Sequence, residues 1–273
     1  MTVGIATPSP DFEEECYADG HSHVHWRGIR IQGGEHFDAY LLGPVHDRLV
    51  DRELLDQLEA ELAALATTQM ATEAVAALLR SQTVPQPWEV GEAIAECLLE
   101  ERLGAVWPWN PQRDKRVPRA SLPGADLVGF LPRGGELLVL LGEVKTSHDQ
   151  DCPPGVMTGR SGMTHQIDTL ASNLEVHFTL LKWLRARCTT APYQDHYRRA
   201  ARAYIQSSGR RLAIFGILIR DTSPNALDLS GRGAALAAST SPLTQIELIA
   251  LYCPRHIEEW PRLLSTGTVG DAH

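Results

Sequence analysis

The sequence predicts an α/β fold in which short apolar strands alternate with amphipathic helices. Three observations carry this prediction. Residues 125–131 and 136–145 are apolar runs on either side of the turn sequence PRGG, a pattern typical of a β-hairpin. Two segments with helical periodicity and two further apolar strands follow, at residues 163–187, 193–206, 212–220 and 245–252. This alternation is typical of an α/β domain.

A helix is expected before the hairpin, over residues 89–103. Gly104 follows it directly, and glycine is the residue that most often ends a helix in the left-handed conformation. The order from residue 88 onward is therefore helix, hairpin, helix, strand and strand.

The region before this helix is organised differently. Residues 21–31 alternate like a strand, and residues 51–79 carry leucines at helical spacing. Residues 81–87 hold two prolines and have the composition of a linker. We therefore expect a mainly helical N-terminal accessory or docking region, residues 1–84, and a second unit, residues 85–273.

The composition is that of a folded, acidic protein. The 273 residues include 25 Lys and Arg against 34 Asp and Glu, which gives a net charge of −9. This charge excludes a general nucleic-acid coat protein, because nonspecific binding to phosphates depends on basic side chains. Hydrophobic residues make up 43% and charged residues 22%, so the chain is too apolar to be disordered.

The sequence also limits the cellular compartment and the metal chemistry. No apolar run approaches the roughly 20 residues needed to cross a bilayer, and the N-terminus lacks a signal-peptide pattern. We therefore expect a cytoplasmic protein without membrane contact. None of the five cysteines lies in a C-x-x-C pair, which argues against a disulfide framework, a zinc ribbon and an iron–sulfur site.

The residues that carry chemistry are concentrated in the predicted hairpin. Asp126 begins one strand, and Glu143 and Lys145 lie near the end of the next. Side chains two apart on a strand share a face, and a hairpin brings Asp126 beside them. Two converging carboxylates suit Mg²⁺ or Mn²⁺, and a neighbouring lysine can act on the attacking water or offset charge on a phosphate. The alternative is a buried ion pair at a strand end, with Asp126 as a turn residue.

This pattern resembles the PD-(D/E)xK nuclease superfamily. P-G-A-D ending at Asp126 stands for the PD element, and E-V-K from Glu143 to Lys145 follows after sixteen residues. The resemblance implies a restriction-endonuclease-like core of helix, three-stranded meander, helix and strand over residues 88–220. It also implies metal-dependent hydrolysis of phosphodiester bonds in nucleic acid, with DNA favoured over RNA. Asp126 and Glu143 would hold the metal, and Lys145 would act on the water or the scissile phosphate.

The resemblance implies two further site residues. In this family a glutamate from the preceding helix often completes the metal site, and Glu92 in WEVGEAIAECLLEE resembles it most, with Glu96 as its competitor one turn later. The strand end GEVKTS also resembles the RecB-like branch, in which a glutamine on the following helix joins the site. Gln166 stands at that position and would orient substrate, although Leu170 replaces the branch's usual aromatic residue.

A looser resemblance is to nuclease subunits of bacterial anti-phage defence systems such as the Hachiman type, through GEAIAECLLEE, GADLVGF and GEVK. It implies an effector nuclease that works with a helicase or ATPase. The chain has no Walker A loop, so such a motor would be another protein. We expect that partner, or a second copy of the chain, to dock on residues 1–84.

Two other functions stay open. One is a catalytically silent, nuclease-like subunit that binds DNA or acts as a scaffold. The other is a Mg²⁺-dependent phosphatase or nucleotide hydrolase, which the missing nucleotide-binding loop disfavours.

Two more patterns have both a functional and a structural interpretation. Basic clusters at residues 113–119 and 198–211 are candidate phosphate contacts or solvated helix faces. His21, His23 and His25 alternate and could share one strand face as metal ligands, although an exposed strand face is the more common explanation.

Overall fold

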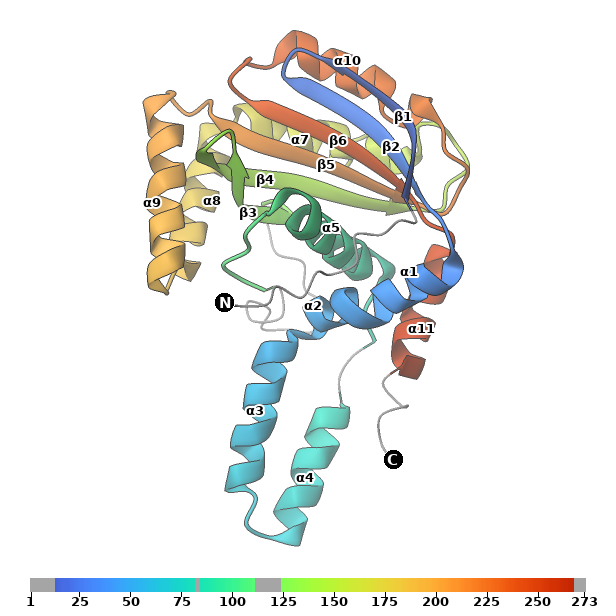
Figure 1. Cartoon of the computed structure of the whole chain (residues 1–273), viewed down its shortest axis with the longest axis vertical. Helices are drawn as coiled ribbons and strands as arrows, with labels where there is room; N and C mark the ends of the chain where they lie inside the picture. The colour runs from blue at the N-terminus through green and yellow to red at the C-terminus, as the bar shows by residue number, and fades with distance from the viewer. Residues whose placement is uncertain (1–12, 82–83, 111–123, 268–273) are drawn as a thin grey trace, which may run out of the picture.

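The computed structural model describes residues 13–81, 84–110 and 124–267. Within these ranges the chain forms a six-stranded mixed sheet in the order β1-β2-β6-β5-β4-β3 (Figure 1). Strands β2, β6, β5 and β4 run parallel, whereas β1 and β3 pair antiparallel at the two edges. This confirms the predicted α/β class. The strands are β1 Glu13–His21, β2 Val24–Ile31, β3 Leu127–Arg133, β4 Glu136–Ser147, β5 Leu212–Arg220 and β6 Gln245–Tyr252.

One face of the sheet is covered by helix α5 and by helices from both ends of the chain. Phe37, Leu99 and Trp260 lie in the apolar core that these helices share with the sheet. Helix α5 confirms the predicted helix before the hairpin, and it ends at Gly104, whose φ is 66°. The elements on this face are α1 Gly34–Tyr40, the π-helical turn η1 Leu41–Val45, α2 His46–Val50, α5 Pro87–Leu103 and α11 Trp260–Gly267.

The opposite face carries a second apolar core beneath four helices. These helices include the two predicted segments after the hairpin, and Ile167, Leu184 and Leu236 are among their buried residues. The four helices are α7 Met163–Ser172, α8 Leu174–Arg187, α9 Ala191–Gln206 and α10 Ser230–Ser239. Three short 3-10 turns connect elements, at η2 Gly155–Met157, η3 Ala226–Asp228 and η4 Ile257–Glu259.

Helices α3 Arg52–Leu65 and α4 Gln69–Arg80 form a hairpin that extends away from the sheet (Figure 1). Neither helix contains a buried residue. The segment predicted to be helical over residues 51–79 therefore forms two helices, which are divided at residues 66–68. Thr68 caps α4 by accepting a hydrogen bond from the backbone N of Ala71 at 3.2 Å, and it therefore starts a second helix.

Two other predicted elements are divided for similar local reasons. The helix predicted over residues 163–187 breaks at Asn173, whose side chain accepts from the backbone N atoms of Glu175 and Val176 and begins α8. The strand predicted over residues 21–31 is interrupted by a turn at Ser22, whose φ is 60°. His21 therefore ends β1 and His25 lies on β2, so the three alternating histidines do not share one strand face.

The boundary between residues 84 and 85 stays a prediction. Strands β1 and β2 precede that boundary yet belong to the same sheet as the strands after it, because β2 pairs with β6. Phe37 contacts Trp260 edge to face, with ring centroids 6.0 Å apart. None of the described helices is long and apolar enough to cross a membrane.

Candidate active site

The predicted hairpin forms and brings Asp126 opposite Glu143. Strand β3 pairs with β4 from Leu127↔Gly142 onward, and Asp126 directly precedes it. The backbone N of Asp126 donates to the Gly142 carbonyl at 3.1 Å. Its carboxylate accepts a hydrogen bond from the backbone N of Val144 at 2.8 Å. The Asp126 side chain therefore bonds to a β4 amide that lies beyond the paired part of β3 and β4. This hydrogen bond holds the Asp126 carboxylate beside Glu143.

Lys145 completes the cluster from the same strand. Its Nζ donates to Glu143 Oε1 at 2.5 Å. The Glu143 side chain is 7% exposed and that of Lys145 is 22% exposed. The Glu143 carboxylate is therefore buried, whereas the Lys145 ammonium group reaches the solvent.

The cluster lies on the face of the sheet that carries α7 and α8. Along β4, Leu138, Leu140 and Val144 belong to the core beneath α5, whereas Val139 and Leu141 belong to the other core. Glu143 and Lys145 continue the second series, because alternate side chains share a face.

Small residues let the neighbouring helices approach this cluster. Gly216 is the register partner of Glu143 on β5, and a Cβ at Gly216 would lie 2.5 Å from Ile167 on α7. Gly124 precedes the cluster, and a Cβ there would lie 3.0 Å from Leu180 on α8. Helices α7 and α8 therefore both pack closely on the part of the sheet that carries the two carboxylates.

The electrostatics of the pair favour an incoming cation. Burial and the adjacent Asp126 carboxylate raise the pKa of Glu143 to about 7. Burial also raises the pKa of Asp126, against the opposing effects of the Val144 amide and the Lys145 charge. Two buried carboxylates side by side resist ionising together, and a divalent cation would stabilise both charges. The donor set therefore fits a hard ion such as Mg²⁺ or Mn²⁺, which Asp126 and Glu143 would hold.

The helical glutamates have different environments. Glu96 is buried and receives a hydrogen bond from Arg48 Nε at 2.5 Å, so this competitor for the third carboxylate is held by an ion pair with α2. Glu89 accepts from the backbone N of Gln86 in the capping box of α5.

Glu92 is half-buried next to the point where α5 crosses the strand that carries the cluster. A Cβ at Gly91 would lie 2.1 Å from Thr146 Oγ1, so the helix contacts β4 one residue beyond Lys145. Helix α5 is nevertheless on the opposite face of the sheet from Glu143. Among the described residues, no three His, Cys, Asp or Glu side chains gather closely enough to hold a metal, so the structure does not bring Glu92 together with Asp126 and Glu143.

Gln166 lies on α7, the helix next to the cluster, and is half-buried. Its Nε2 donates to the Arg160 carbonyl at 3.5 Å, a contact within the α7 entry loop. Of the two basic clusters, residues 113–119 lie outside the described residues, as does Pro123 of the PD-like element. Residues 198–211 lie on α9 and the turn after it.

Sequence reasoning missed a buried network at the end of the same strands. Arg220 pairs in register with Ser147, and its Nη1 donates to Asp228 Oδ1 at 2.5 Å, with both side chains fully buried. Arg220 also donates to the Asp149 carbonyl, which fixes the loop that follows Lys145. Tyr252 donates to Asp228 Oδ2 at 2.8 Å. An arginine at the end of the apolar strand LAIFGILIR was the available signal.

Comparisons of this chain with family models, with curated proteins and with solved structures find no match.

Proposed function

We propose that this protein is a metal-dependent nuclease of the PD-(D/E)xK type. The observation that carries the proposal is the convergence of Asp126, Glu143 and Lys145 at the end of one hairpin. The element order α5, β3, β4, α7 and β5 supports it, because the superfamily core has the same order. An isolated antiparallel bridge between Val106 and Phe130 stands where the first strand of the meander would be.

Each residue of the cluster has a separate task in this proposal. Asp126 and Glu143 hold Mg²⁺ or Mn²⁺, and the metal, when bound, supplies Lewis-acid stabilisation of negative charge on the phosphate. Lys145 orients and helps deprotonate the attacking water, or offsets charge on the scissile phosphate. Gln166 orients substrate from α7. Glu92 stays a candidate third ligand on the sequence resemblance alone, because the structure does not bring it together with Asp126 and Glu143.

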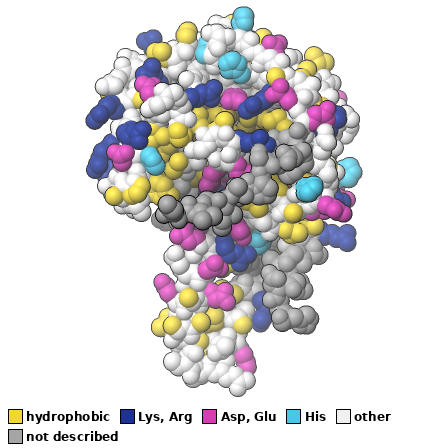
Figure 2. Space-filling view, in the orientation of Figure 1, with side chains coloured by type: hydrophobic (Ala, Val, Ile, Leu, Met, Phe, Trp, Pro, Cys, Tyr) yellow, Lys and Arg dark blue, Asp and Glu magenta, His cyan; other side chains and the backbone are white. Residues whose placement is uncertain are grey.

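DNA is the proposed substrate, and α9 is its proposed contact surface. Arg198 and Arg202 are exposed on this helix, and Figure 2 shows Lys and Arg side chains gathered in its region. The helix packs on the same face of the sheet as the cluster. Guanidinium groups in such a row contact backbone phosphates, which position a duplex without reading its sequence.

The proposed nuclease is the effector of an anti-phage complex and acts with a helicase or ATPase, or as a homo-oligomer. The net charge of −9 opposes unassisted binding to DNA, which supports the need for a partner. The α3–α4 hairpin is the proposed docking element. It exposes Leu58, Leu65, Met70 and Leu78, and it carries five acidic and two basic side chains. A partner groove with an apolar floor and a basic rim would match it.

The direct test is cleavage by the purified full-length chain. Plasmid, linear duplex and single-stranded DNA are incubated with Mg²⁺, Mn²⁺ or EDTA, with and without a candidate ATPase. Cleavage that needs the metal, is lost in Asp126→Asn and is retained in Asp168→Asn supports the proposal. Asp168 is a matched control, because it lies on the exposed side of α7.

A catalytically silent, DNA-binding or scaffold subunit is the second candidate. The observation that favours it is that the Val144 amide bonds to Asp126 and Lys145 bonds to Glu143, so each carboxylate has a partner within the chain. Titration with Mn²⁺ separates the two functions, because the silent subunit binds DNA with no metal affinity that depends on Asp126.

A further inference from the structure

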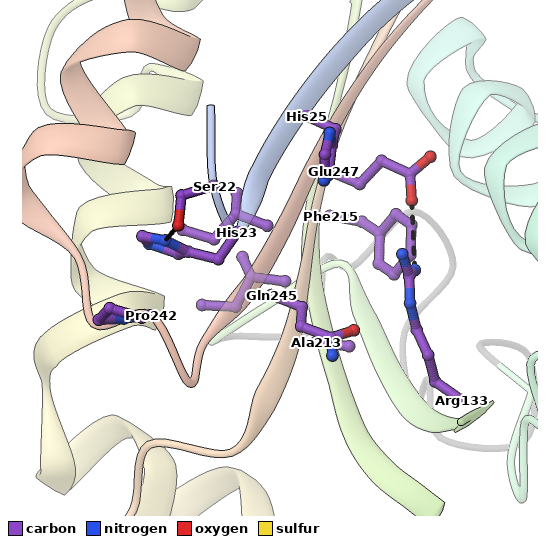
Figure 3. Close-up of a pocket in the computed structure, with 11 residues that line it drawn as sticks. Ser22, His23, His25, Arg133, Ala213, Phe215, Pro242, Gln245 and Glu247 are labelled. Atoms are coloured by element: carbon purple, nitrogen blue, oxygen red, sulfur yellow. Dashed lines mark hydrogen bonds and ion pairs between the residues drawn. The ribbon is translucent and has the colours of Figure 1, made fainter. Parts of the chain in front are cut away.

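A polar pocket lies well away from the cluster of Asp126, Glu143 and Lys145. It has a volume of about 310 Å³ and is lined by His23, His25, Arg133, Phe215, Gln245 and Glu247, among others (Figure 3). Arg133 and Glu247 point toward each other on one side, and His23 lies with Ser22 on the other (Figure 3).

The register of the sheet shows that the two sites are separate. Gln245 pairs with Ala213 at the start of β5, whereas Lys145 pairs with Leu218. Five residues of strand separate these two rows, which corresponds to about 16 Å at the usual rise per residue. Glu247 pairs with Phe215, which belongs to the core beneath α5, so the pocket opens on the other face of the sheet from Glu143.

Three charged side chains meet at the pocket, with Arg133 and Glu247 in its lining and Arg27 beside it. Arg27 donates to Glu247 Oε1 at 2.5 Å, and Arg133 approaches Glu247 Oε2 only to 3.6 Å. Glu247 is the only acid among the described residues that line the pocket. Arg27, Arg133 and Glu247 together carry a net charge of +1. Arg133, whose side chain is 41% exposed, makes the longer of the two ion pairs with Glu247 and can also pair with a second anion.

The polar groups of the pocket favour a ligand that carries a hydrogen-bond donor as well as a negative charge. The side-chain oxygen of Gln245 is buried and has no hydrogen-bond partner within the described chain. A buried acceptor without a donor is costly, so a ligand that supplies an O–H or N–H group would be favoured there. His23 is held by Thr240, since its Nε2 lies 2.7 Å from the Thr240 hydroxyl. Pro242 adds exposed apolar surface, whereas Phe215 is almost fully buried in the core beneath the pocket.

We propose that this pocket binds a small phosphorylated molecule that carries a hydroxyl or amino donor, such as a sugar phosphate or a nucleoside monophosphate. The phosphate pairs with Arg133, and the donor bonds to Gln245. The volume lies at the lower end of the range for small-molecule sites, which limits the ligand to a compact molecule. This site does not depend on the proposed nuclease chemistry.

Binding is tested by thermal unfolding and isothermal titration of the full chain in EDTA, so that the result is independent of the metal site. The probes are ribose 5-phosphate and adenosine monophosphate, with ribose, adenosine and inorganic phosphate as controls. We expect ribose 5-phosphate and adenosine monophosphate to raise the Tm, and we expect ribose and adenosine to have no effect on it. Arg133→Gln should weaken binding at least tenfold. Arg30→Gln, an exposed arginine on β2 outside the pocket, should bind like the wild type.

The remaining outcomes each decide part of the proposal. Gln245→Ala should weaken ribose 5-phosphate and leave inorganic phosphate unchanged. Equal binding of inorganic phosphate and ribose 5-phosphate would overturn the role of Gln245. Failure of every small phosphate to bind, or equal binding by Arg133→Gln, would overturn the site itself. Binding of a DNA oligonucleotide at Arg133 with no small-molecule binding would also overturn it, and would instead identify a backbone contact.

Discussion

Lys145 Nζ lies 2.5 Å from Glu143 Oε1, so two of the three ionisable side chains of the candidate active site are joined within one strand. Lys145→Ala should abolish cleavage, by at least about 100-fold, because it removes a preorganised cation from the reacting phosphate. The fold and metal binding should largely remain. The measurement is DNA cleavage beside circular dichroism and Mn²⁺ titration. Lys182→Ala on α8 is the matched lysine control, and wild-type cleavage by Lys145→Ala would exclude the assigned role.

Metal binding should strengthen as the pH rises toward 7 and change little above it. A cation binds the ionised carboxylates, and Glu143 ionises with a pKa of about 7, so protons compete with the metal below that value. The apparent affinity for Mn²⁺ should fall by up to about tenfold for each pH unit below 7. Calorimetric titration across this range tests it, and Glu143→Gln should weaken binding and flatten the profile.

Glu143→Gln should stabilise the metal-free protein at alkaline pH. The pKa of Glu143 is raised from 4.5 to about 7 on folding, so its contribution to stability is present below pH 4.5 and is lost as the pH rises through 7. Above that pH the variant should be more stable by roughly 1–3 kcal/mol. Urea unfolding in EDTA at several pH values measures the difference. Glu136→Gln, an exposed acid at the start of the same strand, should show no such gain.

Substitution by Gln should lower mainly the stability of the fold at Glu96 and mainly the rate of cleavage at Glu92. Glu96→Gln leaves Arg48 without its charge partner in a buried site and should destabilise the fold by roughly 3–5 kcal/mol. Glu92→Gln should change the free energy of unfolding by less than about 1 kcal/mol and lower cleavage. Denaturant unfolding and cleavage assays on the two variants test both statements. Full cleavage by Glu92→Gln would remove it from the mechanism.

The α3–α4 hairpin should be dispensable for folding and required for the partner. Leu58→Ser and Leu65→Ser should change the free energy of unfolding by no more than about 0.5 kcal/mol, because both side chains are exposed. They should disrupt copurification with a coexpressed ATPase, or self-association measured by sedimentation. Gln57→Ala on the same helix is the control. Truncation of residues 1–80 is unsuitable, because it removes β1 and β2 from the central sheet.

The sequence predicted the hairpin with Asp126 and Glu143, because two short apolar runs flank the turn sequence PRGG. A short turn fixes the register of the two strands that it joins. Gly134 and Gly135 both take positive φ there, as that turn requires. The same rules could not find the pairing of β2 with β6, since those strands are more than 200 residues apart in the chain. Side chains such as Arg48, which meets Glu96 only through tertiary packing, gave no sequence signal.

The pocket beside Arg133 was missed for a similar reason. Its polar residues come from the β1–β2 turn, β2, β3 and β6, and each looks like an ordinary polar position at or near a strand end. Glu247 in QIELIALY was the one available hint, because a carboxylate interrupts an otherwise apolar strand.

The pairing of β2 with β6 also sets the order in which a newly made chain can fold. Trp26 lies opposite Leu248, so the β1–β2 hairpin emerges from the ribosome long before the strand that holds it in the sheet. The parallel pairs β4–β5 and β5–β6 also wait for later segments, and such long-range parallel pairing is slow. The sheet therefore closes only after β6 has been synthesised, and nascent chains expose the apolar face of β2 until then.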